Sequence, residues 1–68
     1  MMMRIFINGA LKEIAGGLTV KKLLDTLKLN SEAIAVELNL EVVSKKEYDA
    51  KYLKEGDKIE IISFVGGG

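Results

Sequence analysis

The sequence contains no cysteine, no histidine and no proline. The absence of cysteine excludes disulfide bonds, thiolate nucleophiles and cysteine-ligated metal sites. The absence of histidine excludes imidazole acid–base chemistry. Asp and Glu are present, but so small a domain offers no pocket that would hold two of them as a catalytic dyad. We therefore predict that the protein is not itself an enzyme.

A net charge is also absent, because ten basic residues balance ten acidic ones. A neutral chain has no bulk attraction for nucleic acid or for an anionic membrane, so we expect neither as a partner. No apolar run approaches the roughly 20 residues of a membrane span, and the start Met1-Met2-Met3-Arg4 lacks the features of a signal peptide. We expect a cytoplasmic protein.

The composition that remains is typical of one small globular domain. The chain has 68 residues, of which 49% are hydrophobic and 29% are charged. A chain of this length buries about 60% of its unfolded surface, around a single core. We expect it to fold alone and to be a monomer when free.

The first half of the chain predicts a hairpin followed by a helix. Residues 3–7 show the period-two pattern of a strand. Asn8-Gly9 is a hairpin signal, because both residues tolerate positive φ, and Leu11 to Ile14 returns as the second strand. After Gly16-Gly17, Thr19 caps an amphipathic helix. The apolar stripe of that helix comprises Val20, Leu23, Leu24 and Leu27.

The second half predicts further strands. Ile34 to Leu38 alternates as a third strand, and Glu41 to Val43 is a short partner for it. The charged segment 44–55 suits a loop with a single helical turn, on which Tyr48 and Tyr52 pack four residues apart.

The Gly56-Asp57 turn leads into the last strand, Lys58 to Val65. Ile59 and Ile61 share one face of that strand, and Ile62 and Phe64 share the other. We expect the helix stripe to bury against the inward residues of the strands, which are Met3, Ile5, Ile7, Ile14, Val36, Ile59 and Ile61.

This order of elements predicts an α+β fold of the β-grasp, or ubiquitin-like, type. It is a mixed sheet of four to five strands with one main helix packed on one face. Residues 1–65 form the domain, and residues 66–68 form a flexible C-terminal glycine tail. The last strand is expected to return beside the first, in the middle of the sheet.

Several segments resemble the ThiS family of ubiquitin-like sulfur carriers in thiamine biosynthesis. They are the opening Met3 to Gly9, Leu18-Thr19-Val20, Ile34-Ala35-Val36, the turn Glu55-Gly56-Asp57, and the final Phe64-Val65-Gly66-Gly67-Gly68. The resemblance covers essentially the whole chain. It implies that the first and last strands are parallel.

The resemblance also implies the chemistry. A ThiF-type adenylating enzyme uses ATP to attach AMP to the carboxylate of Gly68, a sulfur donor protein converts it to a thiocarboxylate, and a ThiG-type thiazole synthase takes the sulfur. Gly66 and Gly67 form the slender tail that lets the carboxylate enter a narrow site, because glycine has no Cβ and free backbone torsions. The chain itself would bind no cofactor and no metal, since ATP belongs to the adenylating partner.

Four residues are expected to contact these partners, because their side chains point away from the helix or lead into the tail: Phe6, Ile62, Phe64 and Val65. The alternative for Phe6, Ile62 and Phe64 is a core position beneath a covering loop. An open sheet with one helix has only one covered face, which favours an exposed patch.

Two other functions remain open. One is a MoaD-type sulfur carrier for molybdopterin or for another pathway, and carriers of that type tend to be longer around the helix. The other is a non-covalent β-grasp interaction module, such as an RNA-binding domain. That reading predicts a basic surface, which the balanced charge disfavours.

Overall fold

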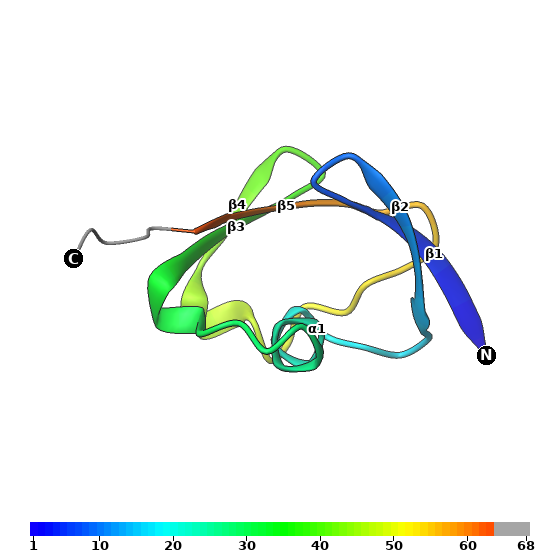
Figure 1. Ribbon diagram of the computed structural model, residues 1–68. Helices are drawn as coiled ribbons and strands as arrows, with labels where there is room; N and C mark the ends of the chain where they lie inside the picture. The colour runs from blue at the N-terminus through cyan, green and yellow to red at the C-terminus, as the bar shows by residue number, and fades with distance from the viewer. Residues whose placement is uncertain (64–68) are drawn as a thin grey trace.

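The computed structural model describes residues 1–63 as a five-stranded mixed sheet with one α-helix on one of its faces (Figure 1). The elements are β1 (Met2–Ile7), β2 (Ala10–Ala15), α1 (Val20–Thr26), β3 (Ile34–Leu38), β4 (Glu41–Val43) and β5 (Lys58–Ser63), with 3₁₀ turns at Ser31–Ala33 and Lys45–Glu47. The predictions made for Phe64, Val65, Gly66, Gly67 and Gly68 lie outside the described residues.

The last strand lies in the middle of the sheet, whose order is β2-β1-β5-β3-β4. β5 is parallel to β1, with Phe6 beside Lys58 and Ile7 beside Ile59. On its other edge, β5 is antiparallel to β3 over five residue pairs. The expected α+β architecture and the parallel pairing of the first and last strands are both confirmed.

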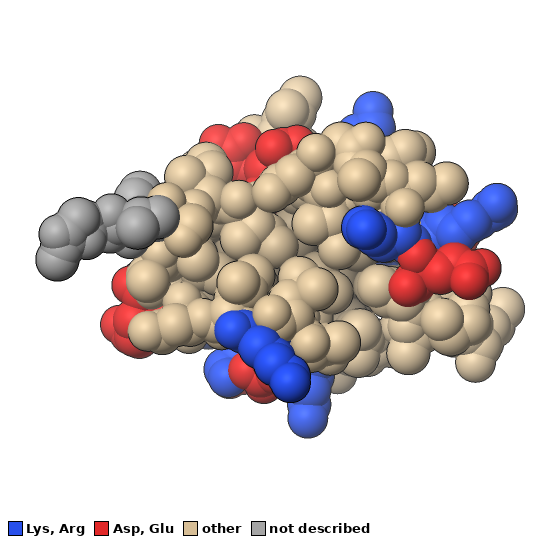
Figure 2. Space-filling model, in the orientation of Figure 1, with Lys and Arg blue, Asp and Glu red and all other residues tan. Residues whose placement is uncertain are grey.

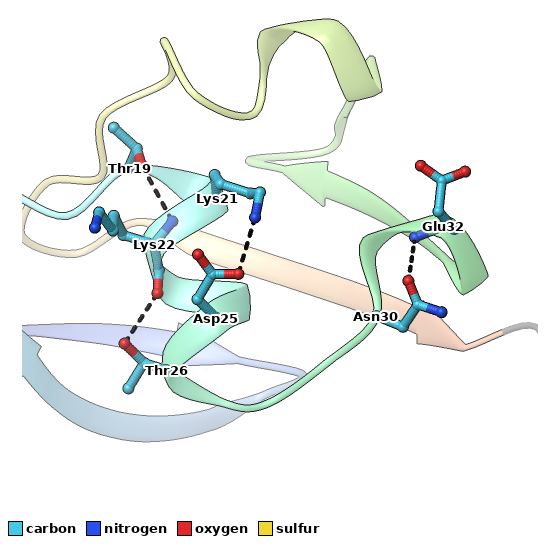
Figure 3. A network of polar contacts seen from close by, with 7 residues as sticks. All are labelled: Thr19, Lys21, Lys22, Asp25, Thr26, Asn30 and Glu32. Atoms are coloured by element: carbon cyan, nitrogen blue, oxygen red, sulfur yellow. Dashed lines mark hydrogen bonds and ion pairs between the residues drawn. The ribbon is translucent and has the colours of Figure 1, made fainter.

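Helix α1 is short and is closed at both ends by hydrogen bonds. Thr19 is the N-cap, and its Oγ1 accepts a bond from the Lys22 N–H at 3.1 Å (Figure 3). At the other end Lys28 has φ of 60°, and the Leu29 N–H donates to the Leu24 carbonyl at 2.9 Å. This is the Schellman arrangement that ends helices in a left-handed residue, here without the usual glycine.

The early end of α1 corrects one predicted core residue. Leu27 is the C-cap and is 40% exposed, so it does not continue the apolar stripe into the core. Val20, Leu23 and Leu24 are buried as predicted. Leu29, beyond the helix, packs against the core instead.

The rest of the core comes from the strands and from the loop before β5. Its buried members are Ile5, Ile34, Val36, Leu38, Val43, Tyr48, Leu53 and Ile59, with Met3, Ile7, Ile14 and Ile61 packed around them. The prediction that Tyr48 and Tyr52 pack together on one turn is wrong. Tyr48 is buried, whereas Tyr52 is 66% exposed and lies in an extended segment that bridges to Thr19.

Substitution of Leu24 tests this core. Leu24→Ala should lower the free energy of unfolding by about 2–5 kcal/mol, because it leaves a cavity beneath the sheet in a site that is 0% exposed. The control is Leu27→Ala, which should cost about 1 kcal/mol or less because that side chain is exposed. Equal denaturant midpoints for the two variants would contradict the assignment.

Candidate functional site

One face of the sheet is not covered by α1, and we call it the outer face (Figure 1). Residues paired across neighbouring strands project to the same side, so Leu11, Phe6 and Lys58 share this face. Alternation along β5 adds Glu60 and Ile62. The outer face includes Arg4, Phe6, Leu11, Glu13, Ala35, Glu37, Val42, Lys58, Glu60 and Ile62.

The predicted contact residues that the structure describes lie on this face. Ile62 is 47% exposed, and Phe6 is half-buried. The alternative that they form a core beneath a loop is excluded for Ile62 by its exposure. Sequence reasoning missed Leu11, which is opposite Phe6, and Val42, although both are exposed and their strand phase could have identified them.

Two open hollows flank the Phe6 ring. The first, of about 250 Å³, is lined by Arg4, Phe6, Leu11, Glu55 and Gly56. The second, of about 380 Å³, is lined by Phe6, Gly9, Lys58 and Glu60. Both are open depressions rather than enclosed cavities, so they suit the side chains of a protein partner better than a small substrate.

Charged groups surround the apolar part of the outer face. Glu37 lies directly opposite Glu60 across β3 and β5, and within residues 1–63 neither carboxylate forms an ion pair. Figure 2, which shows the outer face from its edge at the top of the picture, has carboxylates along that edge. Like charges in directly opposite positions destabilise a sheet. A partner that brings basic groups would relieve this repulsion.

The start of β5 is fixed by a buried aspartate that sequence reasoning did not single out. Asp57 is 3% exposed, and its carboxylate accepts bonds from the Lys54 N–H at 2.8 Å and from Asn39 Nδ2 at 3.0 Å. Asn39 Oδ1 in turn accepts a bond from the Lys58 N–H at 3.0 Å. The only sequence signal here was the Gly56-Asp57 turn.

The shifted ionisable groups lie away from the outer face and reflect packing and capping. Burial raises the pKa of Tyr48 above its usual value. The hydrogen bond from the Ser44 hydroxyl is the main cause that lowers the pKa of Glu47, and a hydrogen bond to Asp25 raises the pKa of Lys21.

The described residues, 1–63, offer neither a metal-ion cluster nor a membrane-spanning helix. They contain no group of three or more acidic residues that could hold a metal ion. None of their helices is long and apolar enough to cross a bilayer.

Comparisons with known proteins agree with this geometry. The ThiS family model matches residues 5–68. A thiazole synthase of Paramagnetospirillum magneticum is 42% identical over 66 residues, which are 97% of this chain but 20% of that protein. The chain thus spans about a fifth of the length of the thiazole synthase that it matches.

Two further comparisons extend over more of the matched protein. The sulfur carrier protein ThiS of Bacillus subtilis is 40% identical over 50 residues, covering 74% of this chain and 76% of that protein. The crystal structure of a thiamine biosynthesis protein, ThiS, from Geobacter metallireducens superposes with a TM-score of 0.83 at 39% identity. The superposition covers 97% of this chain and all of that one, which confirms the β-grasp fold.

Substitution of Asp57 tests the anchor at the start of β5. Asp57→Ala should lower the free energy of unfolding by about 1–3 kcal/mol, because the partly buried hydrogen bonds from the Lys54 N–H and the Asn39 amide lose their acceptor. The control, Asp25→Ala, removes an exposed pair with Lys21 and should cost about 0.5 kcal/mol or less. Chemical denaturation measures both, and equal losses would contradict the anchoring role.

Proposed function

Because the chain belongs to the ThiS family of sulfur carrier proteins, we propose that it carries sulfur for thiamine biosynthesis on the main-chain carboxylate of Gly68. In this role it is a protein co-substrate and not an enzyme. The observation that carries the proposal is the family match, which runs from residue 5 through Gly68. The fold shared with the Geobacter protein supports it.

The reaction needs no side-chain nucleophile from this chain. A carboxylate oxygen of Gly68 attacks the α-phosphorus of ATP and releases pyrophosphate. Sulfide-level sulfur delivered by a sulfur donor protein then attacks the acyl carbon of the adenylate; the bond to AMP breaks, AMP leaves, and a thiocarboxylate remains. ATP is held by the adenylating enzyme, and this chain contributes only the carboxylate and the surface that binds the enzyme.

The glycines suit this step because a narrow site must admit the chain end and align it for in-line attack. Gly67, next to the carboxylate, has no Cβ to meet the walls of that site, and Gly66 is a more tolerant spacer. Five residues follow Ser63, the last residue of β5. They span at most about 17 Å, which is enough to place the carboxylate inside a partner that is docked on the domain.

Thiazole synthase is the partner that the comparisons favour. In the proteins from Paramagnetospirillum magneticum and Magnetococcus marinus, a segment 42% identical to this chain makes up 20% of a protein named thiazole synthase. Linking a carrier to the enzyme that consumes its sulfur raises the effective concentration of one for the other. This supports the thiazole pathway over the molybdopterin alternative.

The adenylating enzyme is the second proposed partner, and the outer face is the proposed docking surface for both. Phe6 and Ile62 would fill apolar pockets of the partner, with Phe64 and Val65 continuing the contact toward the tail. Glu37 and Glu60 favour a partner that carries basic groups. Because the reaction consumes ATP, we place it in the cytoplasm.

Charge placed on the outer face tests the docking proposal. Ile62→Glu should leave folding cooperative, because the side chain is 47% exposed, but should weaken the complex with a ThiF-type enzyme by about tenfold or more. The penalty arises because a carboxylate would be buried against an apolar surface. Titration calorimetry measures the affinity.

The matched control for that variant is Leu27→Glu, which puts the same charge on an exposed leucine beside α1, away from the outer face. It should bind like the wild type. Equal weakening by both variants, or loss of folding in Ile62→Glu, would show that the outer face is not the docking surface.

The length and slenderness of the tail can be tested separately. Removing any one of the three glycines gives the same shortened chain, whose carboxylate is set back by about 3.5 Å. That chain should bind the adenylating enzyme nearly normally but exchange pyrophosphate into ATP at least about tenfold more slowly, because the attack is misplaced.

Alanine substitutions keep the length and test the missing side chain. Gly67→Ala should slow the exchange strongly, whereas Gly66→Ala, one residue farther from the carboxylate, should slow it little. Full exchange activity in the shortened chain would mean that Gly68 is not the reacting residue.

A further inference from the structure

The backbone pairing between β1 and β5 is short. The Phe6 N–H donates to the Asp57 carbonyl and the Asn8 N–H donates to the Ile59 carbonyl, both at 2.9 Å. After Asn8 the chain turns away through Asn8-Gly9, with φ of 50° and 84°. The backbone of β1 therefore holds β5 only as far as Ile59.

Beyond Ile59, the side chain of Asn8 forms hydrogen bonds to β5 in place of the backbone. Asn8 Oδ1 accepts a bond from the Ile61 N–H at 2.7 Å, and Asn8 Nδ2 donates to the Ile61 carbonyl at 3.3 Å. The amide group thus acts as a peptide group of an extra strand residue, with one acceptor and one donor. The Asn8 side chain therefore extends the hydrogen bonding along this edge of β5 by two residues, from Ile59 to Ile61.

From these contacts we infer that Asn8 is a positioning residue for the transfer reaction: it fixes the direction in which β5 leaves the sheet toward Gly68. The inference rests on the proposed function. Past Ile61 the described part of β5 is paired only with β3, through Ala35–Ile62 and Ile34–Ser63. Without the Asn8 amide, Ile59 would be the last residue of β5 with hydrogen bonds on both edges. Ile59 lies two residues before Ile61, which adds about 7 Å of chain between this anchor and the Gly68 carboxylate.

A longer span beyond the last two-sided anchor spreads the carboxylate over a larger volume. Fewer bound complexes then have it aligned with the α-phosphorus of ATP, although the docking surface is intact. Loss of Asn8 should therefore slow the chemical step and leave the affinity for the partner nearly unchanged. A residue that only closes the hairpin turn would not produce this separation.

Asn8→Gly is the variant that separates the two roles, because glycine adopts the positive φ of the turn and removes both amide bonds. Asn39→Gly is its counterpart on the opposite edge of β5. Asn39 is also a turn asparagine, with φ of 52°, but its side chain holds β5 at Lys58, at the start of the strand. The Asn39→Gly variant should lose at least as much stability as Asn8→Gly, without changing the direction in which β5 leaves the sheet.

The experiment measures single-turnover adenylation of the full chain by a saturating amount of the ThiF-type enzyme from the same organism, together with the dissociation constant and amide hydrogen exchange. For Asn8→Gly we expect a rate about tenfold below wild type, a dissociation constant within about twofold, and faster exchange at the Ile61 N–H. Asn39→Gly should be adenylated at close to the wild-type rate. Asn8→Asp, which keeps the acceptor and loses the donor, should lie between wild type and Asn8→Gly.

A wild-type rate in Asn8→Gly, or unchanged protection of its Ile61 N–H, would overturn the inference and leave the proposed function standing. Parallel rate losses in Asn8→Gly and Asn39→Gly would also overturn it, because the effect would then follow stability alone. If the wild-type chain were not adenylated at all, the proposed function would fail and the inference with it.

Discussion

The parallel pairing of β1 with β5 is the constraint on which the rest of the structure depends. It brings the two ends of the sequence together, so that Ile7 lies beside Ile59, which is completely buried. β3 closes the other edge of β5, and α1 covers the inner face. The segment that leads to Gly68 thus continues the central strand of the sheet, and both hairpin turns, at Asn8 and Asn39, hold that strand with their side chains.

The two faces of the sheet meet different requirements. The inner face provides the stability of a small domain through close packing. The outer face leaves Leu11, Val42 and Ile62 exposed, and the proposed docking of a partner would cover them. Glu37 and Glu60 add negative charge to that face, and they lie directly opposite each other, where like charges repel. This combination supports the proposal that a partner with basic groups docks on the outer face.

Most of the fold could be predicted from the pattern of residues. β3 and β4 have the predicted bounds, and the β1–β2 hairpin differs by a residue or two. The end of α1 was missed because Lys28 occupies the left-handed position where glycine is the usual signal. The anchoring roles of Asp57 and Asn8 could not be predicted, because their partners lie on other elements and no periodicity encodes such contacts. The parallel strand pairing came from family resemblance, not from the pattern.

We propose that the folded domain provides recognition while the chemistry occurs on the main chain at Gly68. Intact-protein mass spectrometry tests it most directly, after the wild-type chain is incubated with a ThiF-type enzyme, ATP and a sulfur source. One oxygen should be replaced by one sulfur, and fragmentation should place the change on the C-terminal peptide. Sulfur on any other residue, or no mass change in a chain that binds the enzyme, would contradict it.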